Sequence, residues 1–348
     1  MFAGMSGKVR WGILGTGNIA RQFAAGVRSS RRGQFAAVAS RSGGAAQTFA
    51  AEFGIPAAVE GYDRLIAAPD VDAVYVSLPN TLHHPWTIAA LRAGKHVLCE
   101  KPIGANAREA EEMFDAAERA GRMLVEAFMY RSHPQTLEIM SAVKRGDIGE
   151  LRLIRTSFCF CSTKIAGNIR FNSELAGGSL MDIGCYCINF SRLFAGCEPE
   201  SVHAIGRIHS SGVDESAAGT LRFPNGVLAS FTSGMRLHAD NTAYLCGTEG
   251  YIEIPWAWKP PADGATYVVT RSIPPRQDVA PSALPSRTSG SAPRDVRRLP
   301  ATGPLYAIEA DDFAATVLDG QPPRLDRRDT VGNMRVLDEM RRQIGLKY

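Results

Sequence analysis

The sequence lacks the features that direct a chain into or across a membrane. None of its apolar runs approaches the roughly 20 residues that a membrane-spanning helix needs. Residues 1–8 have no charged head followed by an apolar core, so they do not resemble a secretion signal. The net charge of +4 is mild, and Lys and Arg are not concentrated on one face. We therefore expect a cytoplasmic protein that binds neither membrane nor nucleic acid.

The cysteines do not form the pattern of a metal site or of a disulfide framework. There are seven, an odd number, and no Cys-x-x-Cys pair occurs. Cys159 and Cys161, like Cys185 and Cys187, are two residues apart, which is not the spacing of zinc ligands. We expect reduced thiols and no metal.

A glycine-rich turn near the amino terminus predicts a dinucleotide site. The apolar strand 9–14 runs into Gly15-Thr16-Gly17-Asn18-Ile19-Ala20, and a helical pattern follows to Val27. Gly15 permits the tight turn, Gly17 lets backbone approach a diphosphate, and the small Ala20 lets helix and strand pack closely. The start of the helix offers unpaired N–H groups to phosphate. A purely structural turn is the alternative.

The end of the second strand, residues 34–40, favours NADP. An acid there would bind the ribose hydroxyls of NAD, but residues 34–51 contain no Asp or Glu. Ser40 and Arg41 occupy the position instead, and an arginine can pair with a 2′-phosphate. NAD stays open as a second cofactor, and a solvated arginine is the alternative interpretation.

Strands and helices then alternate up to about residue 128. Helices are predicted over 45–53, 62–67, 83–92 and 106–120, and strands over 71–77, 95–99 and 123–128. The loop Ser77-Leu78-Pro79-Asn80 ends one strand, where it would border the nicotinamide half of a dinucleotide. His83 opens the next helix, where it could face this site or cap the helix.

Glu100-Lys101-Pro102 closes the fourth strand. Proline ends a sheet ladder and restricts the residue before it, so Lys101 is held at the carboxyl end of the strand. Ligands of open parallel sheets bind beyond those ends. Taken alone, these residues also fit an ordinary surface lysine.

The pattern changes in the second half of the chain. Half-exposed strands are predicted over 151–158, 202–209, 215–223, 227–234 and 243–254, with a hairpin turn at 224–226. Residues 176–194 include a helix on which Asp182 and Tyr186, four apart, share a face. The segment 270–304, rich in Pro, Ser and Arg, is predicted to be a long loop, followed by helices over 305–318 and 330–344. The 348 residues thus predict two domains, 1–129 and 130–348.

Four motifs in this order carry a family resemblance: the turn at 15–20, Ser77-Leu78-Pro79-Asn80, Glu100-Lys101-Pro102, and Gly178-x3-Asp182-x-Gly184-x-Tyr186. Over nearly its whole length the chain resembles the glucose–fructose oxidoreductase, inositol dehydrogenase and rhizopine-catabolism (Gfo/Idh/MocA) family. The resemblance implies an α/β fold: a Rossmann domain with a doubly wound parallel sheet, then an α+β domain with a large, mostly antiparallel open sheet. It also implies a homodimer or homotetramer formed through that sheet.

Tyr186 stands where many members of the family carry histidine. Together with Glu126-Ala127-Phe128-Met129-Tyr130-Arg131-x-His133-Pro134, it resembles the branch of NADP-dependent D-xylose 1-dehydrogenases and trans-dihydrodiol dehydrogenases. Met129 departs from the aromatic residue usual there in the dihydrodiol enzymes.

The resemblance implies hydride transfer between nicotinamide and a sugar, polyol or related alcohol or carbonyl, most closely as an aldose 1-dehydrogenase acting on D-xylose-like sugars. A keto- or anhydro-sugar reductase, a trans-dihydrodiol dehydrogenase and a non-catalytic NADP-sensing regulator remain alternatives. The expected cofactor-binding residues are Gly15, Thr16, Gly17, Asn18, Ile19, Ser40, Arg41, Ser77, Leu78, Pro79, Asn80, His83, Glu100 and Lys101. The expected substrate-binding residues are Lys101, Arg131, Arg170, Asp182 and Tyr186.

Lys101, Tyr186 and Asp182 are the expected catalytic residues. By the resemblance, Lys101 contacts the reacting oxygen, either Lys101 or Tyr186 transfers the proton, and Asp182 orients the substrate or the lysine. Lysine and tyrosine both titrate near about 10 when unperturbed. Burial is expected to lower the pKa of Lys101, and a nearby cation to favour the tyrosinate form of Tyr186.

Overall fold

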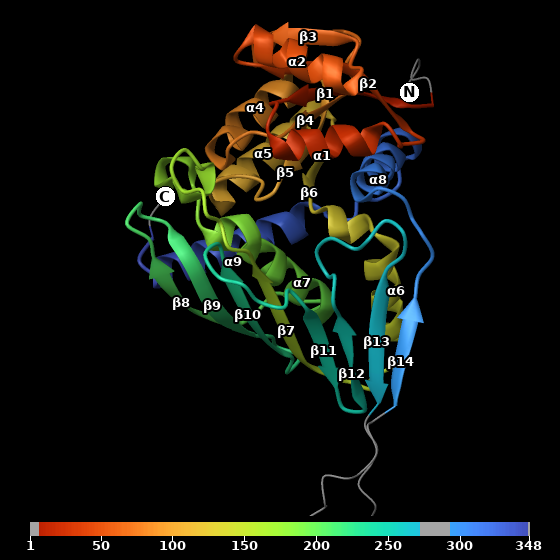
Figure 1. Cartoon of the computed structure of the whole chain (residues 1–348), viewed down its shortest axis with the longest axis vertical. Helices are drawn as coiled ribbons and strands as arrows, with labels where there is room; N and C mark the ends of the chain where they lie inside the picture. The colour runs from red at the N-terminus through yellow and green to blue at the C-terminus, as the bar shows by residue number, and fades with distance from the viewer. Residues whose placement is uncertain (1–6, 272–292, 347–348) are drawn as a thin grey trace, which may run out of the picture.

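The computed structural model describes residues 7–271 and 293–346, which form two sheets with helices packed between and around them (Figure 1). The first sheet is wholly parallel, in the order β3-β2-β1-β4-β5-β6. Its strands are β1 Val9–Leu14, β2 Gly33–Ser40, β3 Ala57–Glu60, β4 Ala73–Val76, β5 His96–Glu100 and β6 Leu124–Ala127. Its connecting helices are α1 Asn18–Val27, α2 Gly43–Phe53, α3 Tyr62–Ala67, α4 Asn80–Arg92 and α5 Ala107–Ala120.

The second sheet has eight strands in the order β14-β13-β12-β11-β7-β10-β9-β8, antiparallel except between β7 and β10. Its strands are β7 Leu151–Cys159, β8 Ser201–Ile208, β9 Asp214–Arg222, β10 Leu228–Gly234, β11 Ala243–Gly247, β12 Gly250–Ile254, β13 Thr266–Arg271 and β14 Arg294–Arg298. The helices of this half are η1 Met129–Ser132, α6 Pro134–Lys144, η2 Ile169–Phe171, η3 Ser173–Leu175, η4 Leu180–Gly184, α7 Cys185–Ala195, α8 Leu305–Asp319 and α9 Arg327–Gln343. The expected fold class is confirmed.

Local sequence explains the elements that border the site. All four residues of β4 and all five of β5 are buried, as expected for central strands covered on both faces. The side chain of Asn106 accepts a hydrogen bond from the N–H of Glu109 and caps α5. The same helix ends at Gly121 in the left-handed conformation.

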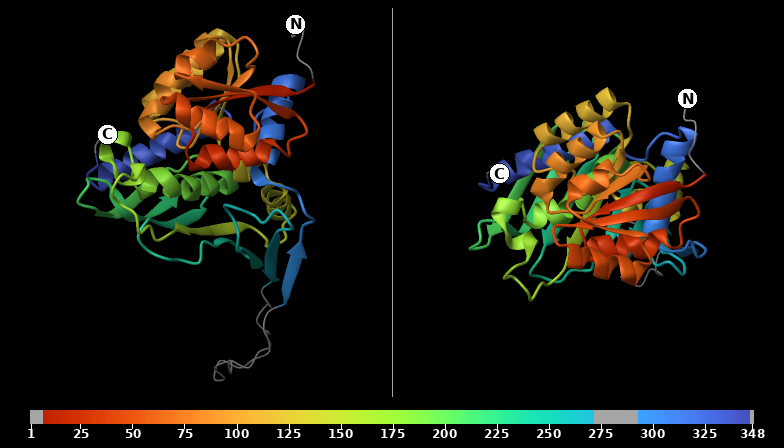
Figure 2. Two further views of the ribbon diagram at one scale, coloured as in Figure 1. Left: turned by 45° about the horizontal axis from the view of Figure 1, so that its top comes forward. Right: turned by 90° about the horizontal axis from the view of Figure 1, so that it is seen from above.

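The last two helices tie the two halves together. Helix α8 lies beside α1 and covers part of the first sheet (Figure 1), and its Phe313 ring lies 5.0 Å from the ring of Trp11. Helix α9 packs on both α5 and α7, so it sits between the sheets (Figure 2). The predicted boundary at residue 129 falls at the start of η1, and α8 crosses back over it.

Five expectations about elements are corrected, among them the single strand expected over 243–254, which is the antiparallel pair β11 and β12. The short strand β3 was not predicted, and α4 begins at Asn80 rather than His83. The segment 180–194 is a π-helical turn followed by α7, not one α-helix. Part of the expected loop 270–304 is β14, which pairs with β13, while residues 272–292 lie outside the described residues. Strand β14 is highly charged, as is common at a sheet edge, so its composition resembles that of a loop.

Candidate functional site

The glycine turn after β1 leaves space for a diphosphate. Gly15 has φ of 101°, and a Cβ there would lie 2.9 Å from the carbonyl oxygen of Ser77. Gly17 caps α1 without any side-chain hydrogen bond, and a Cβ built on it would meet nothing within 4 Å. The first N–H groups of α1 therefore face open space, which fits the diphosphate of a dinucleotide.

Arg41 is exposed directly after β2, where the adenine ribose of a dinucleotide would lie. Ser40 pairs in register with Glu60 at the end of β3, and Glu60 was not found by sequence reasoning because β3 was not predicted. The carboxylate of Glu60 lies against Gly43 in the first turn of α2, where a helix dipole favours negative charge. The strand ends that border this part of the site therefore carry an arginine, Arg41, and a carboxylate, Glu60.

The loop after β4 is fixed by its own polar groups. The hydroxyl of Ser77 donates to the carbonyl of Leu14 at 2.7 Å, and the amide of Asn80 donates to the carbonyl of Ala176 at 2.8 Å. Pro79 precedes the first turn of α4. The contact of Asn80 joins the dinucleotide half of the chain to the segment that carries Asp182.

His83 is buried, and its two ring nitrogens each lie 2.8 Å from a backbone carbonyl, those of Pro102 and Leu78. Burial lowers the pKa of His83 to about 4, because it outweighs the two carbonyls, which act to raise that pKa. The neutral ring therefore lies between the loop after β4 and the loop that holds Lys101, and its single N–H donates to one of the two carbonyls.

Lys101 lies at the centre of a charged cluster formed by both halves of the chain. Its Nζ donates to the backbone carbonyl of Asp182 at 2.7 Å and lies 3.3 Å from Oδ1 of the same residue. The other carboxylate oxygen, Oδ2, accepts from Nε of Arg170 at 2.6 Å. Asp182 belongs to the π-helical turn η4, a form of helix that is frequent at functional sites. The buried carboxylate of Asp214 fixes this turn by accepting hydrogen bonds from the groups that precede and begin η4.

The pKa of Lys101 moves in the direction opposite to the one expected. Burial acts to lower it, but the Asp182 carboxylate and other nearby groups outweigh burial, so the pKa of Lys101 is raised. Burial acts to raise the pKa of Asp182, and the cations of Lys101 and Arg170 reverse that effect and lower it. The cluster is therefore fully ionised at neutral pH, with Lys101 as an ammonium ion.

Tyr186 presents its ring, rather than its hydroxyl, to Lys101. The ammonium lies 5.1 Å from the ring centroid, and the hydroxyl donates to Sδ of Met129 at 3.2 Å. Burial raises the pKa of Tyr186 well above its usual value, and the negative charge of Glu100 acts in the same direction. The expectation of a tyrosinate is corrected: the hydroxyl keeps its proton.

Arg131 does not reach this cluster. It is buried and pairs with Asp329 at 2.7 Å, while its guanidinium also donates to the side chain of Asn189 and the carbonyl of Arg324. These partners fix η1 to the start of α9. The expected contact of Arg131 with substrate is therefore corrected to a structural role.

A cavity of about 100 Å³ lies at the cluster. Its lining comes from both halves of the chain: Ile19, Leu78, Asn80, His83, Glu100, Lys101, Ile169, Arg170, Leu175, Gly177 and Asp182. Ile169, Leu175 and Gly177 were missed by sequence reasoning because they lie in short irregular segments without a motif. Glu100 is buried behind Lys101 and accepts a hydrogen bond from the hydroxyl of Tyr75.

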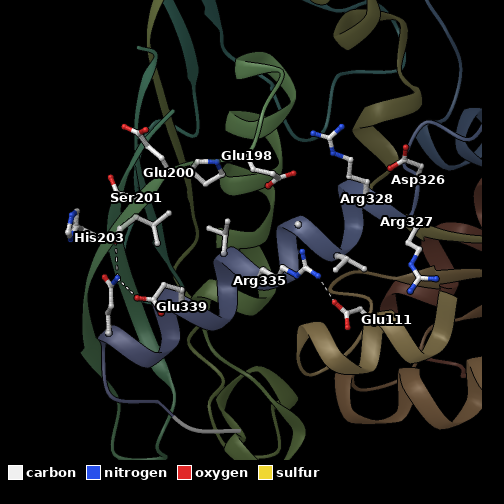
Figure 3. Close-up of a pocket in the computed structure, with 16 residues that line it drawn as sticks. Glu111, Glu198, Glu200, Ser201, His203, Asp326, Arg327, Arg328, Arg335 and Glu339 are labelled. Atoms are coloured by element: carbon white, nitrogen blue, oxygen red, sulfur yellow. Dashed lines mark hydrogen bonds and ion pairs between the residues drawn. The ribbon is translucent and has the colours of Figure 1, made fainter. Parts of the chain in front are cut away.

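A larger cavity of about 1060 Å³ lies elsewhere, between α5, α9 and β8 (Figure 3). None of the expected site residues lines it. Its charged side chains largely pair with protein groups, as Arg335 does with Glu111 at 2.6 Å and Glu198 with Arg192 at 2.5 Å.

Within the described residues no group of three or more potential metal ligands occurs, and no helix is long and apolar enough to cross a membrane.

Glu126 supports the segment that carries Lys101. It is buried on β6, and its Oε1 accepts a hydrogen bond from the N–H of Ile103 at 3.0 Å. Burial raises its pKa from 4.5 to about 8, and the charge of Asp329 acts in the same direction. This carboxyl group therefore keeps its proton at neutral pH in the folded protein.

The raised pKa of Glu126 predicts a pH-dependent contribution to stability. Between pH 4.5 and about 8 the folded protein holds a proton that the unfolded chain releases, so the free energy of unfolding falls as pH rises through this window. In Glu126→Gln this decline is removed. We expect urea unfolding at pH 5 and pH 8 to show wild type losing about 3 kcal/mol more than the variant. The exposed Glu249→Gln should follow wild type, and parallel curves for Glu126→Gln and wild type would contradict a buried protonated carboxyl.

The two halves of the chain match the two parts of one family. Residues 9–128 match an oxidoreductase family with an NAD-binding Rossmann fold, and residues 136–253 match the GFO/IDH/MocA C-terminal domain. The chain therefore belongs to the GFO/IDH/MocA family of oxidoreductases. The resemblance seen in the motifs and the prediction of an enzyme that works with a nicotinamide dinucleotide are confirmed.

Individual relatives act on several kinds of substrate. The chain is 35% identical to D-xylose 1-dehydrogenase (NADP(+)) 2 of Haloferax volcanii, over 94% of this chain and 95% of that protein. It is 39% identical to mouse trans-1,2-dihydrobenzene-1,2-diol dehydrogenase, over 72% of this chain and 76% of that protein. Among solved structures it resembles KijD10, a 3-ketoreductase from Actinomadura kijaniata in complex with NADP and TDP-benzene. That match has a TM-score of 0.84 and 34% identity, and it covers 97% of this chain and 98% of KijD10.

Proposed function

We propose that this protein is an NADP-dependent sugar dehydrogenase, most closely an aldose 1-dehydrogenase acting on D-xylose-like sugars. The observation that carries the proposal is the Lys101–Asp182–Arg170 cluster, which lies at a cavity that also contains Ile19 of the glycine-turn helix. The similarity to a D-xylose dehydrogenase over almost the full chain supports the choice of an aldose.

Each residue of the cluster has a separate role in this proposal. A bound nicotinamide supplies a hydride acceptor or donor. Lys101, half-buried at the cavity, contacts the reacting oxygen and exchanges the proton. In reduction its ammonium donates a proton to the carbonyl oxygen; in oxidation the ammonium first releases its proton, and the resulting amine accepts the proton of the hydroxyl. Asp182 holds that ammonium in place, and Arg170 offers its remaining N–H groups to sugar hydroxyls. Tyr186 supports Lys101 through its ring, while its hydroxyl is bonded to Met129.

The cofactor residues divide into three groups in this proposal. The turn 15–19 binds the diphosphate, residues 40–41 bind the adenosine end, and residues 77–80 with Glu100 and Lys101 border the nicotinamide. His83 positions the last group through its two backbone contacts.

A reductase of keto- or anhydro-sugars is the second candidate. It is favoured by the raised pKa of Lys101, since an ammonium is poised to donate a proton to a carbonyl oxygen. The similarity to KijD10 supports it as well. The similarity to mouse trans-1,2-dihydrobenzene-1,2-diol dehydrogenase keeps a trans-dihydrodiol dehydrogenase as an alternative. A regulator that only senses NADP would need no proton donor, and the retained lysine disfavours it.

A spectrophotometric screen tests these alternatives. Pentoses, hexoses, anhydro-sugars and dihydrodiols are offered with NADP, and keto-sugars with NADPH, while nicotinamide absorbance is followed. We expect NADP reduction to be fastest with an aldopentose. Faster NADPH oxidation by a keto-sugar would assign the reductase instead. NADPH binding without turnover of any compound would assign the regulator.

Arg41 is expected to select NADPH over NADH. In Arg41→Ala the 2′-phosphate loses its cationic partner, so NADPH binding should weaken at least about tenfold while NADH binding changes little. Fluorescence titration of each reduced cofactor measures this. The exposed Arg119→Ala provides the matched control. Equal losses for both cofactors would remove Arg41 from the recognition of the 2′-phosphate.

We also propose that the chain forms a homodimer or homotetramer through the outer face of its second sheet. Apolar side chains are exposed on or beside this sheet, among them Ile205 with 76% and Leu228 with 49% of its surface accessible. Analytical ultracentrifugation would test the assembly, and a monomer at micromolar concentration would contradict it.

We further propose a cytoplasmic location, which is supported by the cysteines: all seven are free thiols.

A further inference from the structure

Lys259 brings a cation to the Lys101 site from a loop that no motif marks. The loop connects β12 to β13 and passes close to α1 (Figure 1). Its Lys259 donates from Nζ to Oε1 of Gln22 at 3.4 Å. Gln22 lies four residues after Asn18, the first residue of α1, so the ammonium sits about one helical turn from the open helix terminus.

The residues next to Lys259 fix its position. Trp258 is buried, and its Nε1 donates to the carbonyl of Ser157 at 2.8 Å. Its ring stacks on Phe158, with centroids 5.5 Å apart, and meets the ring of Tyr186 edge-on at 6.0 Å. Pro260 and Pro261 follow and restrict the backbone. Lys259 therefore lies on an anchored segment, directly after the tryptophan that packs against the Tyr186 ring.

Within the described residues, no carboxylate lies within ion-pair distance of Lys259. The two carboxylates whose charges act on it, Glu100 and Asp182, already have partners: Tyr75 for Glu100, and Lys101 with Arg170 for Asp182. Burial lowers the pKa of Lys259, and the ammonium of Lys101 lowers it further. An additional cation is thus held close to two others, an arrangement that a bound anion would stabilise.

We propose that Lys259 binds an anionic oxygen of a ligand in the Lys101 site. Two sources share this chemistry: the diphosphate of the dinucleotide, and a carboxylate or phosphate carried by the sugar. The proposal rests on the function proposed above for the site, and in the second case it narrows the substrates to acidic or phosphorylated sugars.

The test compares Lys259→Gln, which removes the charge, with Lys259→Arg, which keeps it. Lys144→Gln, an exposed lysine on α6, is the control for a general change of charge. NADPH binding is measured by fluorescence titration at low and high salt. Binding of D-glucose 6-phosphate, D-glucuronate and neutral D-glucose to the NADP-loaded protein is measured by calorimetry.

If the anion is the diphosphate, Lys259→Gln should weaken NADPH binding about tenfold and reduce the salt dependence of that binding. Lys259→Arg should keep the affinity and the salt dependence of wild type. If the anion belongs to the sugar, NADPH binding stays unchanged while Lys259→Gln weakens one acidic sugar about tenfold and leaves D-glucose unchanged. Two results together would overturn the proposal. One is an affinity of Lys259→Gln for NADPH within about twofold of that of wild type. The other is that Lys259→Gln binds both acidic sugars as tightly as wild type does, or that neither protein binds them. These are binding measurements, so they test the role of Lys259 even if no sugar is turned over. The absence of turnover would contradict the proposed function, but not the binding of an anion by Lys259.

Discussion

Replacing Lys101 with methionine should lower kcat at least about a thousandfold while the dissociation constant of NADPH changes only a few-fold. Methionine keeps most of the length and apolar volume of the lysine but cannot carry a proton. The ammonium accounts for both contacts with Asp182, so the variant also loses the link that holds the reacting group in place. Initial rates with the best sugar of the screen, alongside fluorescence titration of NADPH, measure the two effects.

The exposed Lys144→Met serves as the matched control and should retain wild-type rates. Tyr186→Phe should cost less than Lys101→Met, because the ring contact with the ammonium remains and only the hydroxyl bonded to Met129 is lost. Turnover of Lys101→Met within about tenfold of wild type would exclude Lys101 as the group that exchanges the proton.

Replacing Gly17 with leucine should abolish cofactor binding without destabilising the fold. The backbone at Gly17 is extended, with φ of −74° and ψ of −178°, so any residue can adopt it. A side chain there meets no protein atom near its Cβ and extends into the space over the start of α1. We expect NADPH binding to weaken at least about a hundredfold, because the diphosphate and the side chain would occupy the same space.

Thermal unfolding and NADPH titration together test this prediction. The melting temperature of Gly17→Leu should lie within about 2 °C of wild type, and added NADPH should no longer raise it. Gly7→Leu is the control: its Cβ also meets nothing within 4 Å, but it precedes β1 at the opposite end of the strand. Retained NADPH affinity in Gly17→Leu would show that the diphosphate does not bind at this turn.

The first sheet could be predicted in most of its elements because hydrophobic pattern and turn residues agree there. Strand β1, the glycine turn and α1 follow directly from residues 9–27. Strand β3 was not predicted because it has only four residues, every second one exposed, and so short a run gives a weak hydrophobic pattern. The polar composition of β14 is common to sheet edges and to loops, so pairing with β13 decides its structure.

The site could be predicted where a motif places a residue, and not where distant partners decide its role. The meeting of Lys101 with Asp182, 81 positions apart, followed from the family motifs. In the sequence Arg131 was as good a candidate for binding substrate as Arg170. Its role is decided by Asp329, which lies on a helix near the end of the chain and pairs with it. The pKa of Lys101 depends on how burial competes with Asp182, which requires their distance. Lys259 belongs to no motif, and only the path of its loop brings it to the site.

The position of α8 has a consequence for synthesis on the ribosome. Residues 305–319 cover the face of the first sheet around Trp11, although that sheet is otherwise complete by residue 127. A nascent chain would therefore expose this apolar face while the entire second sheet is still being translated. The dinucleotide-binding half, though first to emerge, is among the last to be finished, and a fragment ending at residue 129 would lack one of its own covering helices.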